Sequence, residues 1–186
     1  MRIIRIIFLI VAAALSGTAY AQKIALKNNL LMDGMASVNL GAEFATGART
    51  SVEVPASLNL WSFSDSKKFK HFAVQPEFRW WVCQPFTGHF FGAHAHYASY
   101  NVGGLGPFKA IRNYRYEGWL AGAGVSYGYD WILGPRWSLE ATVGVGYAYM
   151  SMDKFPCGRC RLPVAHKRVH YFGPTRISVS VIFLIK

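Results

Sequence analysis

Apolar and polar residues alternate strictly along several stretches of this chain. From Trp137 to Tyr149, one parity carries large or apolar residues and the other carries mostly small or polar ones. The stretches 119–131 and 175–185 repeat this pattern. Because successive side chains of a β-strand point to opposite faces, a period of two predicts strands with one apolar and one polar face.

Weaker alternation brings the number of predicted strands to eight, with the five further strands at 24–32, 37–44, 51–60, 72–81 and 89–97. Several of the eight match the roughly 9–11 residues that a tilted strand needs to cross a membrane. Short and long connections alternate between most of them, which is typical of outer-membrane barrels. We therefore predict an all-β fold, an eight-stranded antiparallel up-and-down transmembrane β-barrel with both termini in the periplasm.

The strands of a soluble β-sandwich or lipocalin-like barrel would alternate as well. The positions of charged and aromatic residues distinguish a membrane barrel from these soluble folds. Aromatic residues mark the strand ends, as Trp119 and Trp131 do, like two girdles around an apolar band. An eight-stranded barrel is just wide enough for its side chains to fill. Charged residues on the polar parity are therefore expected to form a packed interior network of ion pairs: Lys27, Glu43, Glu53, Glu77, Arg79, Asp130, Glu140 and Arg176.

The first residues have the form of a targeting segment. Arg2 and Arg5 precede an apolar run at 6–15, and Ala19-Tyr20-Ala21 has the form of a cleavage site. This combination predicts a cleaved signal peptide at 1–21, followed by a single barrel domain at 22–186. The apolar run is too short for a membrane-spanning helix.

Composition and charge narrow the class of protein further. The chain is 16% aromatic and only 16% charged, which excludes a disordered protein. Its 20 Lys and Arg outnumber 9 Asp and Glu. The three long connections are predicted at 62–70, 98–113 and 151–169. Many of the cations fall in these connections or beside them, namely Lys67, Lys68, Lys70, Lys109, Arg112, Arg115, Lys154, Arg159, Arg161, Lys167 and Arg168.

Such a basic rim is expected to contact lipopolysaccharide phosphates, outer-membrane lipid or acidic surfaces of partner proteins. A solvated rim that only satisfies lipid headgroups is the plainer interpretation. Nucleic acid is not expected as a partner at this location.

Cys157 and Cys160 lie in the last long connection, where three interpretations remain open. Exported proteins commonly form disulfides, so a Cys157–Cys160 bridge is the first. Reduced thiols are the second. Zinc is the third, because His166 and His170 follow, although the gap between the two pairs is shorter than in finger motifs. No metal and no cofactor is expected, and Cys83 is expected to stay unpaired.

His94 and His96 share the polar parity and invite a catalytic interpretation. Ser57, Ser126 or Glu77 are candidate neighbours, but a nucleophile needs a base within hydrogen-bond reach, and the sequence fixes no such geometry. We therefore expect hydrogen-bonded interior histidines and no enzyme activity. A membrane-lipid-modifying barrel of the lipid A hydrolase or acyltransferase type is the alternative, and a narrow channel is another.

Several motifs carry a resemblance that covers nearly the whole mature chain. They include Lys27-Asn28-Asn29-Leu30-Leu31, Gln75-Pro76-Glu77-Phe78-Arg79-Trp80-Trp81, Gly88-His89-Phe90-Phe91-Gly92 and Arg115-Tyr116-Glu117-Gly118-Trp119. With these motifs the chain resembles an uncharacterised family of small outer-membrane β-barrel proteins of Gram-negative gut and oral anaerobes. Members are often encoded near fimbrillin-type fimbrial genes. The resemblance implies a surface-exposed accessory role, with fimbrial or other surface proteins as partners, and supplies no catalytic residues.

Overall fold

A computed structural model of the protein describes residues 23–62, 68–103, 114–156 and 165–185. The predicted signal peptide at 1–21 lies outside these residues and stays a prediction. The described chain contains one short helix, α2 (Leu30–Gly34), and nine strands. The strands are β1 (Ile24–Asn29), β2 (Val38–Ala45), β3 (Thr50–Ser62), β4 (Lys68–Val74), β5 (Glu77–Trp81), β6 (Gly88–Gly103), β7 (Tyr114–Ile132), β8 (Trp137–Pro156) and β9 (Ala165–Ile185).

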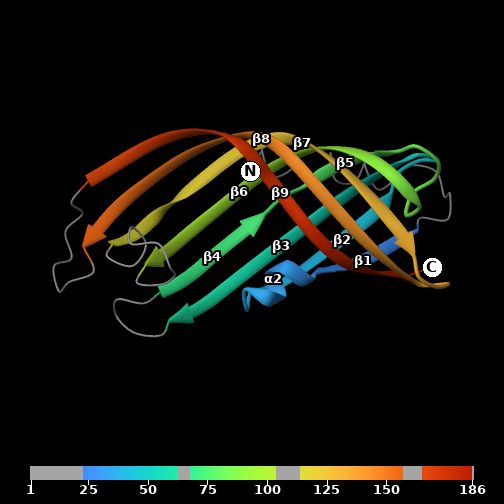
Figure 1. Ribbon diagram of the computed structural model, residues 1–186, viewed down its shortest axis with the longest axis horizontal. Coiled ribbons are helices and arrows are strands. Elements are labelled where there is room, and N and C mark those ends of the chain that lie inside the picture. Colours follow the sequence, from blue (N-terminus) through green and yellow to red (C-terminus); the bar gives the residue numbers. More distant parts are fainter. Residues whose placement is uncertain (1–22, 63–67, 104–113, 157–164, 186) are drawn as a thin grey trace, which may run out of the picture.

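The strands close into an antiparallel barrel (Figure 1). Strands that follow one another along the chain pair, except that β4 does not pair with β5, and β1 closes the ring by pairing with β9, Ile24 opposite Ile185. β4 and β5 share one position, because both pair with β3 on one side and β6 on the other. The predicted eight-stranded antiparallel barrel is therefore confirmed, with one of its eight strands divided in two.

Pro76 explains this division. Proline has no backbone N–H to donate to the ladder. The hydrogen bonds nevertheless continue on both sides, since Gln75 donates to the carbonyl of Pro55 at 3.1 Å and Ala95 donates to that of Pro76 at 3.0 Å. The interruption is thus local and the barrel wall remains closed.

The first strand is shorter than the alternation from 24 to 32 suggests, because the chain turns into α2 at Leu30. The Asn29 side chain caps the helix by accepting from Leu31 N at 3.1 Å. Asn39 holds the same corner, since its Oδ1 accepts from Asn29 N at 2.6 Å and its Nδ2 donates to Asp33 Oδ1 at 2.7 Å. These local polar contacts outweigh the apolar alternation of Leu30 and Met32.

The two ends of the barrel differ. The connections 46–49, 82–87 and 133–136 meet at one end, here called the turn end, where β9 also finishes. The opposite end, called the helix end, carries α2 (Figure 1). The wall is low at β1 and β2, of 6 and 8 residues, and tall at β7, β8 and β9, of 19, 20 and 21. The long connections predicted at 62–70, 98–113 and 151–169 are therefore partly strand.

The distribution of side chains is the reverse of that in a soluble protein, with polar side chains inside the barrel and apolar ones on its outer face. Among the described residues, the fully buried set contains seventeen polar or charged side chains and six apolar ones. The outer face carries large apolar side chains, such as Val125, Val143 and Ile177 at 60%, 58% and 60% exposure. No described helix is long and apolar enough to span a membrane.

A β-bulge in β9 changes which of its side chains face outward. Arg176 pairs with Gly144, but the next residue of β8, Val145, pairs with Pro174, so Thr175 is the extra residue. On the turn-end side of the bulge, Arg176 points inward and Ile177 outward. Beyond the bulge the parity is inverted, because Phe172 pairs with the outward-facing Tyr147. Even-numbered residues of β9 therefore face outward near the helix end.

Candidate functional site in the barrel interior

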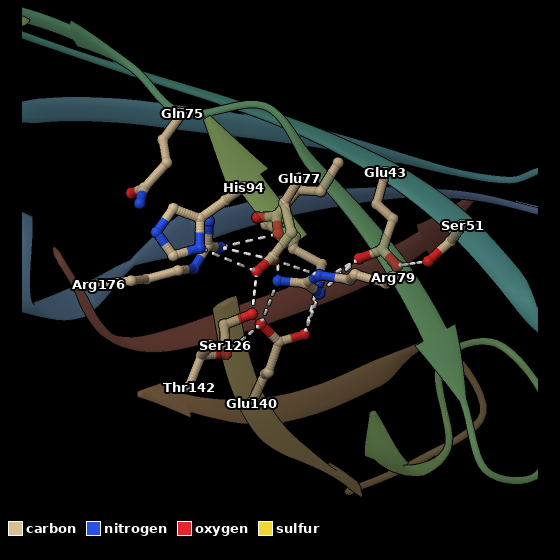
Figure 2. Close-up of polar contacts among 12 residues, drawn as sticks. Glu43, Ser51, Gln75, Glu77, Arg79, His94, Ser126, Glu140, Thr142 and Arg176 are labelled. Carbon is tan, nitrogen blue, oxygen red and sulfur yellow. Dashed lines mark hydrogen bonds and ion pairs between the residues drawn. The ribbon is translucent and has the colours of Figure 1, made fainter. Parts of the chain in front are cut away.

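Arg79 occupies the centre of the interior, where four carboxylates surround its guanidinium group (Figure 2). Its Nε lies 2.6 Å from Glu77, and its Nη1 lies 2.9 Å from Glu43. Glu140 accepts two bonds, from Nη1 at 2.7 Å and from Nη2 at 3.0 Å, and Glu53 also pairs with Nη2. All five side chains are almost fully buried. A planar guanidinium with five donors suits this multiple contact, which a lysine could not make.

Sheet register explains why the carboxylates gather. Glu43 on β2 pairs with Glu53 on β3, which pairs in turn with Glu77 on β5, so three glutamates form one row across neighbouring strands. Like charges directly opposite each other destabilise a sheet. The row is therefore stable only with cations placed over it, and Arg79 supplies the first of these.

Two more cations join the network. Lys27 on β1 pairs with Glu43 and contacts Glu140 Oε2 at 2.5 Å. Arg176 on β9 approaches Glu53 at 2.8 Å and Glu77 at 3.5 Å. Three cations thus face four carboxylates in a network that joins β1, β2, β3, β5, β8 and β9. Buried charges persist only when they are paired and hydrogen-bonded, and the network meets this requirement.

Hydroxyl groups occupy the remaining lone pairs of the carboxylates. Ser51 donates to Glu43, Ser126 donates to Glu77, and Thr142 donates to Glu140 at 3.0 Å. The sequence singles out none of these three as network members. Their position on the polar parity beside the glutamates was the available signal.

An aromatic cluster fills the lumen at the turn end. The ring of Trp81 lies 4.7 Å from that of Phe90 and 6.0 Å from that of Phe86, measured between centroids. Arg79 lies over Phe90, with its guanidinium carbon 4.2 Å from the ring centroid. All three aromatic side chains are buried. A Cβ at Gly128 would clash with the Phe90 ring, so glycine at this position makes room for the cluster.

A cavity of about 140 Å³ with a mixed polar and apolar lining lies on the helix-end side of the network. Its walls include Asn39, Gln75, Arg176 and Ser178. The Nε and Nη1 atoms of Arg176 make no hydrogen bond to another described residue. A space of this size is large enough for several water molecules, which are suitable partners for these donors.

Asp130 is the one predicted network member that the structure leaves outside the ion pairs. It is buried on the same inner face and pairs in register with Glu140. Within the described part of the chain, it makes no salt bridge with a cation. The seven other predicted residues, namely Lys27, Glu43, Glu53, Glu77, Arg79, Glu140 and Arg176, are brought together.

The interior histidine His94 contacts Thr175 rather than the candidate nucleophile Ser126. His94 Nε2 lies 2.9 Å from Thr175 Oγ1, and its Nδ1 lies 3.9 Å from Glu77. Ser126 donates its hydroxyl to Glu77 instead. The rings of His94 and His96 lie 5.8 Å apart.

Several predicted surface residues lie in strands rather than in loops. Lys68 and Lys70 belong to β4, Arg115 to β7, Lys154 to β8, and Lys167 and Arg168 to β9. The loops were overestimated because basic side chains at the ends of the strands interrupt the apolar alternation. Other predictions fall outside the described residues: Lys67, Lys109, Arg112, Arg159 and Arg161, and the candidate disulfide Cys157–Cys160. Cys83 carries an exposed free thiol.

The chain belongs to the family described as protein of unknown function (DUF3575), whose model matches residues 6–185. No curated protein sequence matches the chain.

Proposed function

We propose that this protein is an outer-membrane β-barrel with a closed lumen, and that its role is structural or surface-interacting. The observation that carries the proposal is the reversal of polarity between the two faces of the wall. The inner face holds a network of buried ions, whereas the outer face exposes valine, leucine, isoleucine and aromatic side chains. An apolar surface of this extent is stable in hydrocarbon and not in water.

The dimensions of the apolar belt support the same proposal. Trp131 and Trp119 on β7 mark its two edges, and both are exposed on the outer face. Twelve residue steps of about 3.3 Å each, tilted by roughly 40°, span about 30 Å, close to a bilayer's hydrocarbon thickness. Tyr97 and Tyr149 join Trp119, and Trp137 lies at the other edge. These residues correspond to the two aromatic girdles of membrane barrels.

Orientation follows from the connections. Outer-membrane barrels have short turns on the periplasmic side. We therefore place the turn end, and with it both termini of the barrel, in the periplasm. The helix end then faces the outside of the cell and presents the basic residues Lys70, Lys154, Lys167 and Arg168. These cations suit the phosphates of lipopolysaccharide.

The interior supports a structural role better than a channel. The Trp81, Phe86 and Phe90 cluster fills the turn end, and the ion-pair network fills the middle of the lumen. We therefore assign contacts with other molecules to the basic rim at the helix end. The resemblance to barrels encoded near fimbrillin-type genes makes a fimbrial protein the first protein partner to test, in an accessory role.

One pair of substitutions tests membrane placement. Val125 lies near the middle of the belt and Leu133 lies in a turn, both strongly exposed. An arginine costs about 2–4 kcal/mol at the bilayer midplane and about 0–1 near the interface. Val125→Arg is therefore expected to reduce the folded barrel in the outer-membrane fraction, whereas Leu133→Arg retains it. Equal yields for both variants would overturn the proposal, because a soluble barrel tolerates a charge at either exposed position.

A further inference from the structure

Three side chains on the outer face of β8 and β9 are arranged as a nucleophile, a base and a carboxylate. Ser151 Oγ lies 3.5 Å from His166 Nε2, and His166 Nδ1 lies 2.7 Å from Asp153 Oδ1. With Nδ1 protonated, His166 donates to Asp153 and leaves Nε2 free to accept the Ser151 proton. Each ring nitrogen thus faces the partner that ester hydrolysis by a serine nucleophile requires. The 3.5 Å contact is long, as such contacts often are before substrate binds.

Sheet register and the β9 bulge bring the three residues together. Asp153 pairs with His166, and Ser151 pairs with Arg168. Without the bulge at Thr175, even-numbered residues of β9 would keep the inward orientation of Arg176 along the whole strand. The inversion of parity turns His166 and Arg168 outward, onto the face that holds Ser151 and Asp153.

The arrangement lies at the outer edge of the apolar belt. Trp119, which marks this edge, is the register partner of Ser151 on the other side of β8. Asp153 and His166 lie one step further toward the helix end, where their side chains are 45% and 50% exposed. In the proposed membrane orientation, this level is the interface between acyl chains and headgroups, where the ester bonds of lipids lie.

A hollow that is lined in part by Trp119, the register partner of Ser151, offers room for an acyl chain. It has a volume of about 390 Å³ on the outer face across β3, β4, β6 and β7. Leu60, Phe72, Tyr97 and Trp119 contribute apolar walls. Trp119 thus connects the hollow to the serine, because it lines the hollow and pairs in register with Ser151.

We propose that Ser151, His166 and Asp153 form an esterase site that hydrolyses acyl esters of membrane lipids. The Ser151 oxygen attacks the ester carbonyl while His166 Nε2 takes its proton. The tetrahedral intermediate expels the lipid alcohol, which receives that proton, and an acyl-serine remains. Water, activated by His166, then releases the fatty acid and restores the serine. Asp153 holds the imidazole in orientation and stabilises its charged form.

Arg168 adds a positive charge next to the nucleophile. It is directly opposite Ser151 in register, and side chains at such positions begin about 4.5–5.5 Å apart. A guanidinium there suits either the developing oxyanion or a lipid phosphate. Membrane lipids carry both ester carbonyls and phosphates. This site goes beyond the structural role proposed above, revises the expectation that the barrel lacks activity, and rests on the proposed membrane location.

The test uses the full mature chain refolded into vesicles, with released fatty acids measured by mass spectrometry. One set of vesicles contains phosphatidylethanolamine and phosphatidylglycerol, and the other also contains lipopolysaccharide. The set that releases fatty acid, together with the acyl chains released, identifies which lipid supplies the ester. Release in either set that disappears with Ser151→Ala supports the site. No release from either set overturns it.

Variants separate catalysis from folding. Ser151→Ala and His166→Ala are expected to lower release by about 100-fold or more. Asp153→Asn is expected to lower kcat with little change in KM, and Asp153→Glu to restore part of it. His89→Ala is the matched control, because this histidine also lies on the outer face, bonded to Tyr127 at 2.6 Å near the turn end.

A covalent probe supplies a second readout. Ser151 is expected to displace fluoride from a fluorophosphonate and become labelled, and Ser151→Ala to abolish the label. Equal labelling or release in Ser151→Ala overturns the site. Each preparation is also run unboiled on a gel. A folded band without activity refutes the esterase site alone, whereas a missing folded band refutes the proposed membrane barrel and the lipid-facing site with it.

Discussion

Arg79 and Glu140, 61 residues apart in the chain, meet through two parallel hydrogen bonds of 2.7 and 3.0 Å inside the barrel. This bidentate contact joins β5 to β8 across the lumen, although these strands are not neighbours in the sheet. It therefore fixes the barrel's cross-section in a way that sheet hydrogen bonds alone do not.

Arg79→Met is expected to destabilise the barrel by about 3–5 kcal/mol, because it leaves buried carboxylates without their central cation. Urea unfolding of the barrel in detergent micelles measures this decrease in the free energy of unfolding. Adding Glu140→Gln to Arg79→Met should recover part of it, since one unpaired charge is removed. Arg49→Met is the control, because Arg49 is exposed in a turn. Equal losses for Arg79→Met and Arg49→Met would contradict a central role for the network.

Gly128→Ala is expected to cost about 1–3 kcal/mol, because its new methyl group would clash with the buried ring of Phe90. The same unfolding measurement applies. Gly134→Ala is the matched control, since a Cβ at Gly134 meets nothing within 4 Å. A Gly128→Ala variant as stable as Gly134→Ala would mean that the aromatic cluster is loosely packed.

The wild-type barrel is expected to show no stable conductance in a planar bilayer. Trp81, Phe86 and Phe90 fill the turn end, so ions find no continuous aqueous path. Replacing Trp81 and Phe90 together with alanine should increase conductance. Regular single-channel steps from the wild type would contradict the closed lumen.

Cys83 offers a test of orientation, because its thiol is exposed at the turn end. With Cys157 and Cys160 changed to serine, a membrane-impermeant maleimide should leave intact cells unlabelled. It should label Cys83 once the outer membrane is permeabilised. Labelling in intact cells would place the turn end outside and reverse the proposed orientation.

Reversing Arg159, Arg161, Lys167 and Arg168 to glutamate is expected to weaken capture of lipopolysaccharide-containing vesicles, because anions would repel the phosphates that these cations are proposed to attract. Vesicle pull-down at moderate ionic strength measures this. Reversing Lys23, Arg49 and Arg136, which are exposed at the turn end, is the control. Unchanged capture by the first variant would exclude the basic rim as a contact surface.

Alternation predicts the barrel because the two faces of every strand meet surroundings of opposite polarity. Where a second influence competes, the pattern misleads. Asn29 and Asn39 form side-chain hydrogen bonds that turn the chain into α2, although Leu30 and Met32 continue the alternation. Pro76 divides a strand without ending its ladder, and no period of two reveals this.

Alternation along the sequence predicts the candidate sites only in part as well. Membership of the ion-pair network follows from parity, so Glu43 and Arg79 can be assigned to the interior from the sequence. Their pairing depends on register between strands that are far apart in the chain. The outer arrangement of Ser151 and His166 depends in addition on the bulge at Thr175, which inverts the parity of β9. A one-residue irregularity of this kind leaves no clear signal in a single sequence.

The most direct test of whether the protein is a closed barrel in the outer membrane is its gel mobility in the outer-membrane fraction, with and without boiling. A closed membrane barrel resists detergent until it is heated, so the unboiled protein should migrate at a different position from the boiled one. This shift is expected for the wild type, and a smaller shift is expected for Arg79→Met. A protein recovered from the soluble periplasmic fraction, with the same mobility before and after boiling, would contradict it.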